Sequence, residues 1–367
     1  MTSVASITDV AAEPAATPKL FAPEGPWLFS RRTDLLAFGG SALLAFGLLG
    51  VGALLGVAES DTPDALWIVC VLGLDVAHVW STLYRVYFDG EELRRHPLLY
   101  LAVPLACYAT GVTLYAMDGP LFWTVLAYLA VFHFVRQQVG WVRIYARREH
   151  ASTLDRHLDV GATYLATLWP IVWWHAHLPR AFAWLLEGDF VTGVSAEVAR
   201  WTFPLYVTVL GAWALRQLWR LARGTAPSPG KLVVVTTTFA TWLVGIVLID
   251  GDFAFTVTNV IVHAVPYFVL THRYVRVRAS QRPNAWLARL LRGGPVVFVG
   301  LVVVLAFGEE LFWDRYVWHE RTWLFGEGST LTQTALSLVV PLLALPQATH
   351  YVLDGFVWRA RRSSLLR

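Results

Sequence analysis

Long apolar stretches alternate with short polar segments along the whole chain. Each stretch has about the 20 residues that a helix needs to cross a hydrocarbon core of about 30 Å. The pattern therefore predicts an all-α bundle of about ten transmembrane helices. The expected spans cover residues 34–57, 65–88, 97–117, 120–143, 159–177, 201–221, 231–250, 252–273, 294–311 and 331–358.

Basic residues collect in every second loop between these spans, and acidic residues collect in the others. Arginine and lysine close to helix ends stay in the cytoplasm. The alternation therefore predicts an even number of spans with both termini cytoplasmic, in a bacterial-type inner (plasma) membrane. Two acidic loops, 178–200 and 308–330, are rich in Trp and Phe, and we expect short helices along the outer membrane surface there.

Composition supports a membrane protein, because 56% of the residues are hydrophobic and only 15% are charged. Residues 1–30 are rich in Ala, Pro and Ser and predict a disordered cytoplasmic tail, followed by one transmembrane domain over 31–367. The two cysteines, Cys70 and Cys107, lie in apolar stretches, which excludes a disulfide framework. The chain has no basic tract with interleaved aromatic residues, so we expect membrane lipids and no nucleic acid as partners.

Four histidines lie at one expected depth in the bilayer. His78, His133, His263 and His350 each precede the cytoplasmic end of an even-numbered span by nine or ten residues, which is about 15 Å of helix. Even-numbered spans run in the same direction, so the four imidazoles fall in one layer. The sequence therefore predicts a shared metal site with these histidines as ligands.

Polar side chains accompany the histidines at helical spacings of three or four residues, which share a helix face. They are Asp75, Gln137, Asn259, Tyr267, Gln347 and Asp354. A carboxylate one turn from a histidine either ligates the same ion or orients the imidazole. We assign Asp75, Gln137, Tyr267 and Asp354 to the catalytic machinery around the metal, with Asn259 in a supporting position.

Two arginines, Arg85 and Arg136, lie inside expected spans. Ionisable groups there normally face the bundle interior or a polar cavity and indicate function. We expect both to bind an anionic headgroup or carboxylate of a substrate, since a guanidinium favours bidentate contact with such groups. The alternative is that their side chains reach the lipid headgroups.

Neutral imidazoles with carboxylates suit iron, zinc or copper. Iron, as one or two non-haem ions, is the first choice, because a site inside the bilayer favours a lipid or other long apolar substrate. The typical task of iron there is oxygen activation for desaturation, hydroxylation or oxidative cleavage. Such an oxidase takes electrons from a donor protein, which is a further expected partner.

A histidine-ligated metal on the cytoplasmic side of a membrane resembles the membrane fatty-acid desaturase and hydroxylase superfamily, whose centre is diiron. The chain has neither the His-x-x-x-His nor the His-x-x-His-His box of that superfamily. Its histidines, one on each helix, are similar to those of the bacterial carotene-cleaving dioxygenases, which surround one iron. Both resemblances imply a membrane oxygenase, and no catalytic residue is carried over from either.

Two other classes stay open. Paired histidines ligate b-type haem in electron-transfer subunits, and transporters use intramembrane His, Asp and Arg for protons or substrates. Pro266, three residues after His263, favours the transporter if it breaks its helix. The chain lacks a Gly-x-x-x-x-Gly-Lys phosphate loop, a Gly-x-Gly-x-x-Gly motif and a His-Glu-x-x-His motif, which argues against nucleotide-driven pumping and zinc proteolysis.

Overall fold

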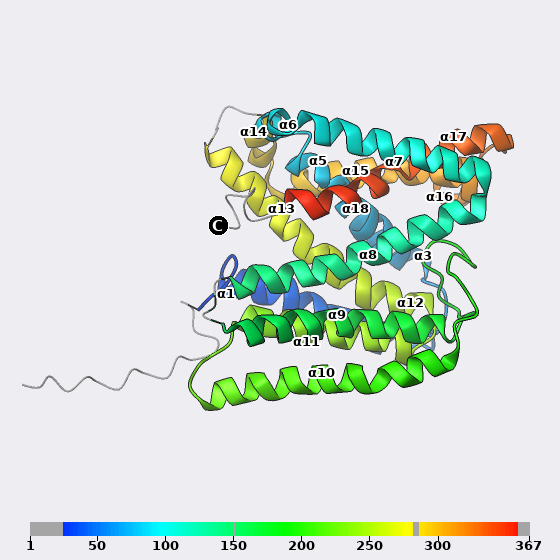
Figure 1. Ribbon diagram of the computed structural model, residues 1–367. Helices are drawn as coiled ribbons and strands as arrows, with labels where there is room; N and C mark the ends of the chain where they lie inside the picture. Colours follow the sequence, from blue (N-terminus) through cyan, green and yellow to red (C-terminus); the bar gives the residue numbers. More distant parts are fainter. Residues whose placement is uncertain (1–24, 148, 150, 282–285, 359–367) are drawn as a thin grey trace, which may run out of the picture.

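The computed structural model describes residues 25–147, 149, 151–281 and 286–358. Within these ranges the chain is helical, with loops between the helices and no strand. The long helices lie side by side and roughly parallel or antiparallel to one direction, which forms a bundle (Figure 1). The expected all-α architecture is confirmed.

Eight helical segments are long and apolar enough to cross a membrane. They are Arg31–Leu54 (α1, η1 and α2), Asp64–Arg85 (α3, η2, α4 and α5), Pro97–Met117 (α7), Gly119–Ala146 (α8), Pro229–Leu248 (α11 and η3), Asp252–Gln281 (α12, η4 and α13), Gly294–Trp318 (α15 and η5) and Gln333–Val357 (α17 and α18). Each matches an expected span. The chain is therefore built as a multi-pass membrane protein would be.

The two remaining expected spans correspond to α9 (Thr153–His175) and α10 (Ala196–Ala222). Both are long enough to cross, and they pack against each other, with α9 also contacting α8 and α11 (Figure 1). They are less apolar than the eight segments above, because Trp, Tyr, Thr and ionisable residues interrupt their apolar residues. Three short helices connect the long ones: α6 (Gly90–Arg95), α14 (Trp286–Arg292) and α16 (Thr322–Phe325).

Two of the four helical segments that carry the histidines are not uniformly α-helical. The π-helical segment η2 (Trp67–Val76) leads into α4 (Ala77–Trp80), and η4 (Thr256–Val260) leads into α13 (Ile261–Gln281). Such turns are rare and occur often at functional sites. Pro266 does not break α13, which continues to Gln281, so the broken helix considered above is not present.

The two loops expected to form surface helices differ from each other. The chain from 178 to 195 has no helix, so that prediction was wrong for the first loop. In the second, α15 (Gly294–Trp313) continues as η5 (Asp314–Trp318) before α16. Glu309, Glu310 and Asp314 therefore lie on this helical segment, where Glu309 is buried.

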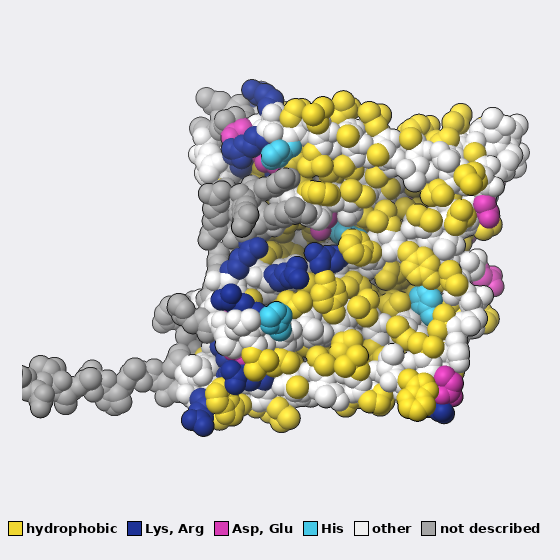
Figure 2. Space-filling model, viewed as in Figure 1, with side chains coloured by type: hydrophobic (Ala, Val, Ile, Leu, Met, Phe, Trp, Pro, Cys, Tyr) yellow, Lys and Arg dark blue, Asp and Glu magenta, His cyan; other side chains and the backbone are white. Residues whose placement is uncertain are grey.

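Buried charge pairs gather at the end of the bundle where α1 begins. Lys231 lies 2.6 Å from Asp159 and 2.7 Å from Glu149. Burial of Asp89 opposes its ionisation, but hydrogen bonds from Arg278 and Tyr274 outweigh this and lower the pKa of the carboxyl to about 2. On the face that Figure 2 shows, most Lys and Arg side chains lie toward the same end. The basic end expected from the loops is thus one physical end of the bundle.

Candidate metal centre

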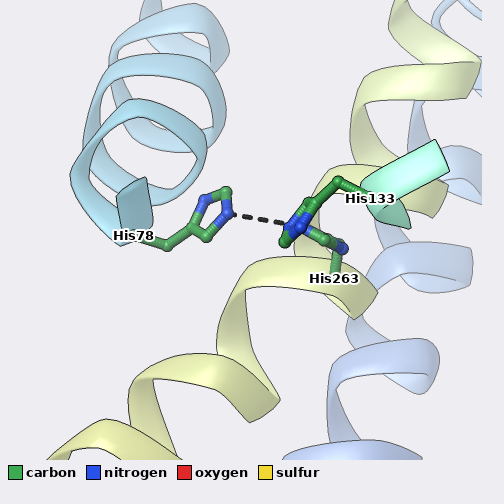
Figure 3. A group of neighbouring side chains, drawn as sticks. All are labelled: His78, His133 and His263. Carbon is green, nitrogen blue, oxygen red and sulfur yellow. Dashed lines mark hydrogen bonds between the residues drawn. The ribbon is translucent and has the colours of Figure 1, made fainter. Parts of the chain in front are cut away.

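The four histidines meet in the middle of the bundle. They come from α4, α8, α13 and α18 (Leu345–Val357), and each is at most 2% exposed. The Nε2 atom of His133 lies 3.2 Å from that of His263 and 3.2 Å from that of His350. The Nε2 atom of His263 lies 3.2 Å from that of His78. Figure 3 shows His78 pointing from its helix toward His133 and His263.

Hydrogen bonds alone do not explain this arrangement. A ring nitrogen of a neutral imidazole carries either one proton or one lone pair in the ring plane, so it makes one hydrogen bond. The Nε2 atoms of His133 and His263 each have two such neighbours. At most two of the three contacts can therefore be hydrogen bonds, and the third brings two buried polar atoms together without a bond.

A metal ion bound among these imidazoles would be compatible with the short contacts. Nitrogens that lie about 2.0–2.1 Å from one ion in a tetrahedral arrangement are about 3.3 Å apart. The observed separations of 3.2 Å are close to that value. His78, His133 and His263 each offer one ligand atom within 4.8 Å of the others. The donor set thus fits a metal ion held by imidazoles.

Two carboxylates lie behind the histidines, on the ring edges that face away from the cluster. Asp75 is 3.6 Å from Nδ1 of His78, and Asp354 is 3.8 Å from Nδ1 of His133. His350 has a closer partner, since its Nδ1 lies 2.6 Å from the hydroxyl of Thr82. Both aspartates therefore lie near the Nδ1 edges of imidazoles, beyond hydrogen-bond distance, and neither lies among the converging Nε2 atoms.

The other polar residues singled out by the sequence lie at different distances from the cluster. Gln137 donates to the backbone carbonyl of His263 at 2.9 Å. The ring of Tyr267 is 5.2 Å from that of His350 between centroids, and its hydroxyl lies beside Asp354. Asn259 is further away, since it donates to the carbonyl of Thr241 on α11 (Pro229–Trp242).

The two arginines have unlike surroundings. Arg85 is 1% exposed, lies 3.2 Å from Glu92 and donates to the carbonyl of Val357 at 2.9 Å. Its charge is therefore already paired inside the bundle, which makes it a poor candidate for a substrate anion. Arg136 is exposed to a cleft and donates to the hydroxyl of Tyr164 on α9.

Sequence analysis missed several neighbours of the cluster. Thr82 lies four residues after His78 on the same helix face, so its spacing was a usable signal. The ring of Tyr351 stacks on His133 at 5.0 Å, and the ring of Phe134 stacks on His263 at 3.7 Å. These aromatic contacts follow from packing between helices, which the sequence pattern does not give.

A cleft of about 940 Å³ reaches the cluster from the side of the bundle. We call it the α8 cleft, because one face of α8 from Tyr128 to Arg147 lines it, opposite residues of α9, α13 and α18. His133 and Asp354 are among the residues that line it. Figure 2 shows a row of Lys and Arg side chains over α8 beside a hollow with hydrophobic borders.

A second cavity, of about 350 Å³, is lined by neighbours of the cluster such as Phe134 and Tyr351, and by none of the four histidines. We call it the carboxylate cavity, because Asp75, Asp252, Glu310 and Glu320 line it. Residues 182–186 of the non-helical loop also line it. The neighbouring short helices α3, α12 and α16 lie at the end of the bundle opposite α1 (Figure 1).

Comparison with protein-family models, with curated proteins and with solved structures gave no significant match.

Proposed function

We propose that this chain is a membrane-embedded metal-dependent enzyme, an iron-dependent oxidase or oxygenase that acts on a lipid or other long apolar substrate. The observation that carries the proposal is the set of three Nε2 contacts of 3.2 Å among four buried histidines. Four neutral imidazoles from four separate helices form a donor set that suits iron, zinc or copper and does not suit magnesium or calcium.

Charge balance supports a divalent ion at this place. An uncompensated charge in the low-dielectric interior is costly. Asp75 and Asp354 together supply two negative charges within 4 Å of ligand rings. They would keep the Nδ1 edges protonated and the Nε2 lone pairs free for the ion. Two further buried polar groups would assist. Gln137 would fix the position of the His263 backbone, and the hydroxyl of Tyr267 would hold a proton beside the site.

Iron is preferred because of what surrounds the donor set. The α8 cleft gives a long, largely apolar molecule access to His133 from the side. Bound iron would supply oxygen activation, which attacks otherwise unreactive carbon chains. An electron donor protein would dock at the cytoplasmic end. Arg136, exposed in the cleft, is a better candidate for contact with the substrate than Arg85.

A bis-histidine haem fits the geometry less well. Its two axial nitrogens lie on opposite sides of the macrocycle, about 4 Å apart. The neighbouring Nε2 atoms are 3.2 Å apart, which leaves no space for a porphyrin between them. Transport has weaker support, because Pro266 lies within a continuous helix.

The topology that goes with this function has ten spans. In it α9 and α10 cross the membrane beside the eight apolar segments, and both termini are cytoplasmic in a bacterial-type inner membrane. The start of α1 and the end of α18 lie toward the same end of the bundle (Figure 1), which agrees with an even number of crossings.

The test is elemental analysis together with an absorption spectrum of the purified full-length protein. Stoichiometric iron without a Soret band is the expected result. A Soret band would select haem instead, and a protein without bound transition metal would overturn the proposal in favour of transport.

A further inference from the structure

The charges along the α8 cleft are unbalanced. Three arginines, Arg136, Arg143 and Arg147, line it together with a single carboxylate, Asp354. All three arginines are exposed to the cleft or to its opening. Within the part of the chain that the structure describes, no carboxylate forms an ion pair with any of them. The cleft therefore has an excess of positive charge beside mostly apolar walls.

The part of the lining that α8 contributes has two unlike halves. Leu129, Phe132, Arg136, Gly140 and Arg143 succeed one another at three- or four-residue intervals, which is a single stripe along α8. Toward the α1 end of the bundle the stripe is basic. Toward the other end it is apolar, and His133 lies next to the junction. This order matches an amphiphile with an acidic end and an apolar chain.

Gly140 opens the space between the arginines. A Cβ atom added there would meet nothing within 4 Å, although the residue lies in the middle of a long helix. Arg136 and Arg143 flank it by one turn on either side. Long helical side chains lean toward the N-terminus of their helix, so Arg143 is directed over the turn of Gly140. An acidic group bound in this space would lie close to the guanidinium of Arg143.

The rise of α8 then determines which part of a bound hydrocarbon chain faces the histidines. His133 precedes Gly140 by seven residues, about 10 Å along the axis. An extended chain advances about 1.2 Å per bond, so the cluster faces a position about eight bonds from the acidic group. The cleft continues to Tyr128, which makes it about 18 Å long from Gly140. The site would thus act on the middle of a long chain and not on its polar end.

We propose that the α8 cleft binds one single-chain amphiphile with an acidic end group, held at Arg143 over Gly140 with its chain passing His133. This assignment rests on the proposed function for its role as a substrate site. One chain is favoured over a two-chain lipid, because the volume of about 940 Å³ is within the range of sites for single small ligands. Guanidinium pairing selects the acid over an alcohol or an amine of equal length.

The test is binding of palmitate, cetyl alcohol and cetylamine to the full-length protein in nanodiscs, by displacement of a fluorescent fatty acid. Palmitate is expected to bind at least tenfold more tightly than the alcohol, and the amine least tightly. Gly140→Leu fills the open space and is expected to weaken palmitate binding at least tenfold with unchanged metal content. Arg143→Gln is expected to weaken palmitate selectively and to leave the alcohol unchanged.

Gly211→Leu is the matched control, since Gly211 lies in α10 outside the cleft and also has nothing within 4 Å of an added Cβ. It should bind palmitate as the unaltered protein does. Equal affinity for palmitate and alcohol, or full binding by Gly140→Leu, would overturn the assignment. Equal displacement by phosphatidylglycerol vesicles would replace the single-chain ligand with a bilayer lipid. A protein that binds palmitate as expected but holds no metal would instead refute the enzyme and leave the acyl site standing.

Discussion

The α8 cleft and the carboxylate cavity differ in their chemistry and in their relation to the histidines. A cluster histidine lines the cleft, whereas only neighbours of the histidines line the cavity. The cleft is long, mostly apolar and basic at one end, whereas the cavity is smaller and has four carboxylates and one arginine, Arg321, in its lining. His133 borders the cleft, and Asp75 behind His78 borders the cavity. The two spaces have Tyr351 in common. Its ring stacks on His133 and forms part of the wall between them.

This difference indicates a division of tasks. An anionic amphiphile is attracted by the arginines of the cleft and repelled by the carboxylates of the cavity, because unscreened charges act strongly in a low-dielectric region. Water and protons, in contrast, are stabilised by carboxylates and not by apolar walls. If the proposed function holds, the cavity is suited to proton supply and the cleft to the substrate.

The largest expected effect comes from removing a central histidine, which tests whether the histidines share one metal ion. His133→Ala removes the histidine whose Nε2 atom contacts two others, so metal content should fall at least tenfold and activity should be abolished, as measured by elemental analysis and oxygen uptake. The matched control is His175→Ala on α9. His175 is also buried but bonds to Tyr128 and to the carbonyl of Ile171. If His133→Ala retained full metal content, the common centre would be refuted.

The second comparison separates the two carboxylates behind the histidines. Asp354→Asn, on the cleft side, and Asp75→Asn, on the cavity side, should each weaken metal affinity about 10–100-fold, as groups that orient metal ligands do. Chelator competition measures this effect. Only Asp354→Asn should also strengthen palmitate binding, because it removes the negative charge from the cleft. Unchanged metal affinity in both variants would exclude an orienting role.

The smallest expected effect contrasts one charge from each space. Arg136→Gln should weaken palmitate binding about fivefold, or about 1 kcal/mol, which is the scale of an exposed ion pair. Glu310→Gln, in the carboxylate cavity, should leave it within about twofold. The fluorescent displacement assay resolves both. The reverse order of effects would place the amphiphile in the carboxylate cavity and not in the α8 cleft.

Much of the fold could be predicted from the sequence, because lipid imposes length and polarity on every span. The depth of the histidines could also be predicted, because the rise of a helix converts residue number into distance along it. Residues 178–195 escaped prediction because Trp and Phe there pack on the bundle, as Phe182 and Trp184 do, without needing a helix.

The rotation of each helix about its axis was harder to predict. Depth placed Arg85 and Arg136 together with the histidines, yet Arg85 turns toward Glu92 in α6, and Arg136 turns into the cleft. Likewise, Asp75 and Asp354 share a face with histidines by spacing, but only coordinates show which ring edge each faces. Partners on other helices decide such questions, and periodicity within one helix does not contain them.

The π-helical segments before His78 and His263 determine how a change in their length would alter the site. A π turn holds more residues than an α turn, so each such segment changes the phase of everything that precedes it by up to about 100° for each extra residue. Loss of one residue from η2 would keep the span apolar and long enough, yet Asp75 would point elsewhere. Insertions and deletions in these two segments are thus a route by which a structural bundle of this kind gains or loses its chemistry without changing its topology.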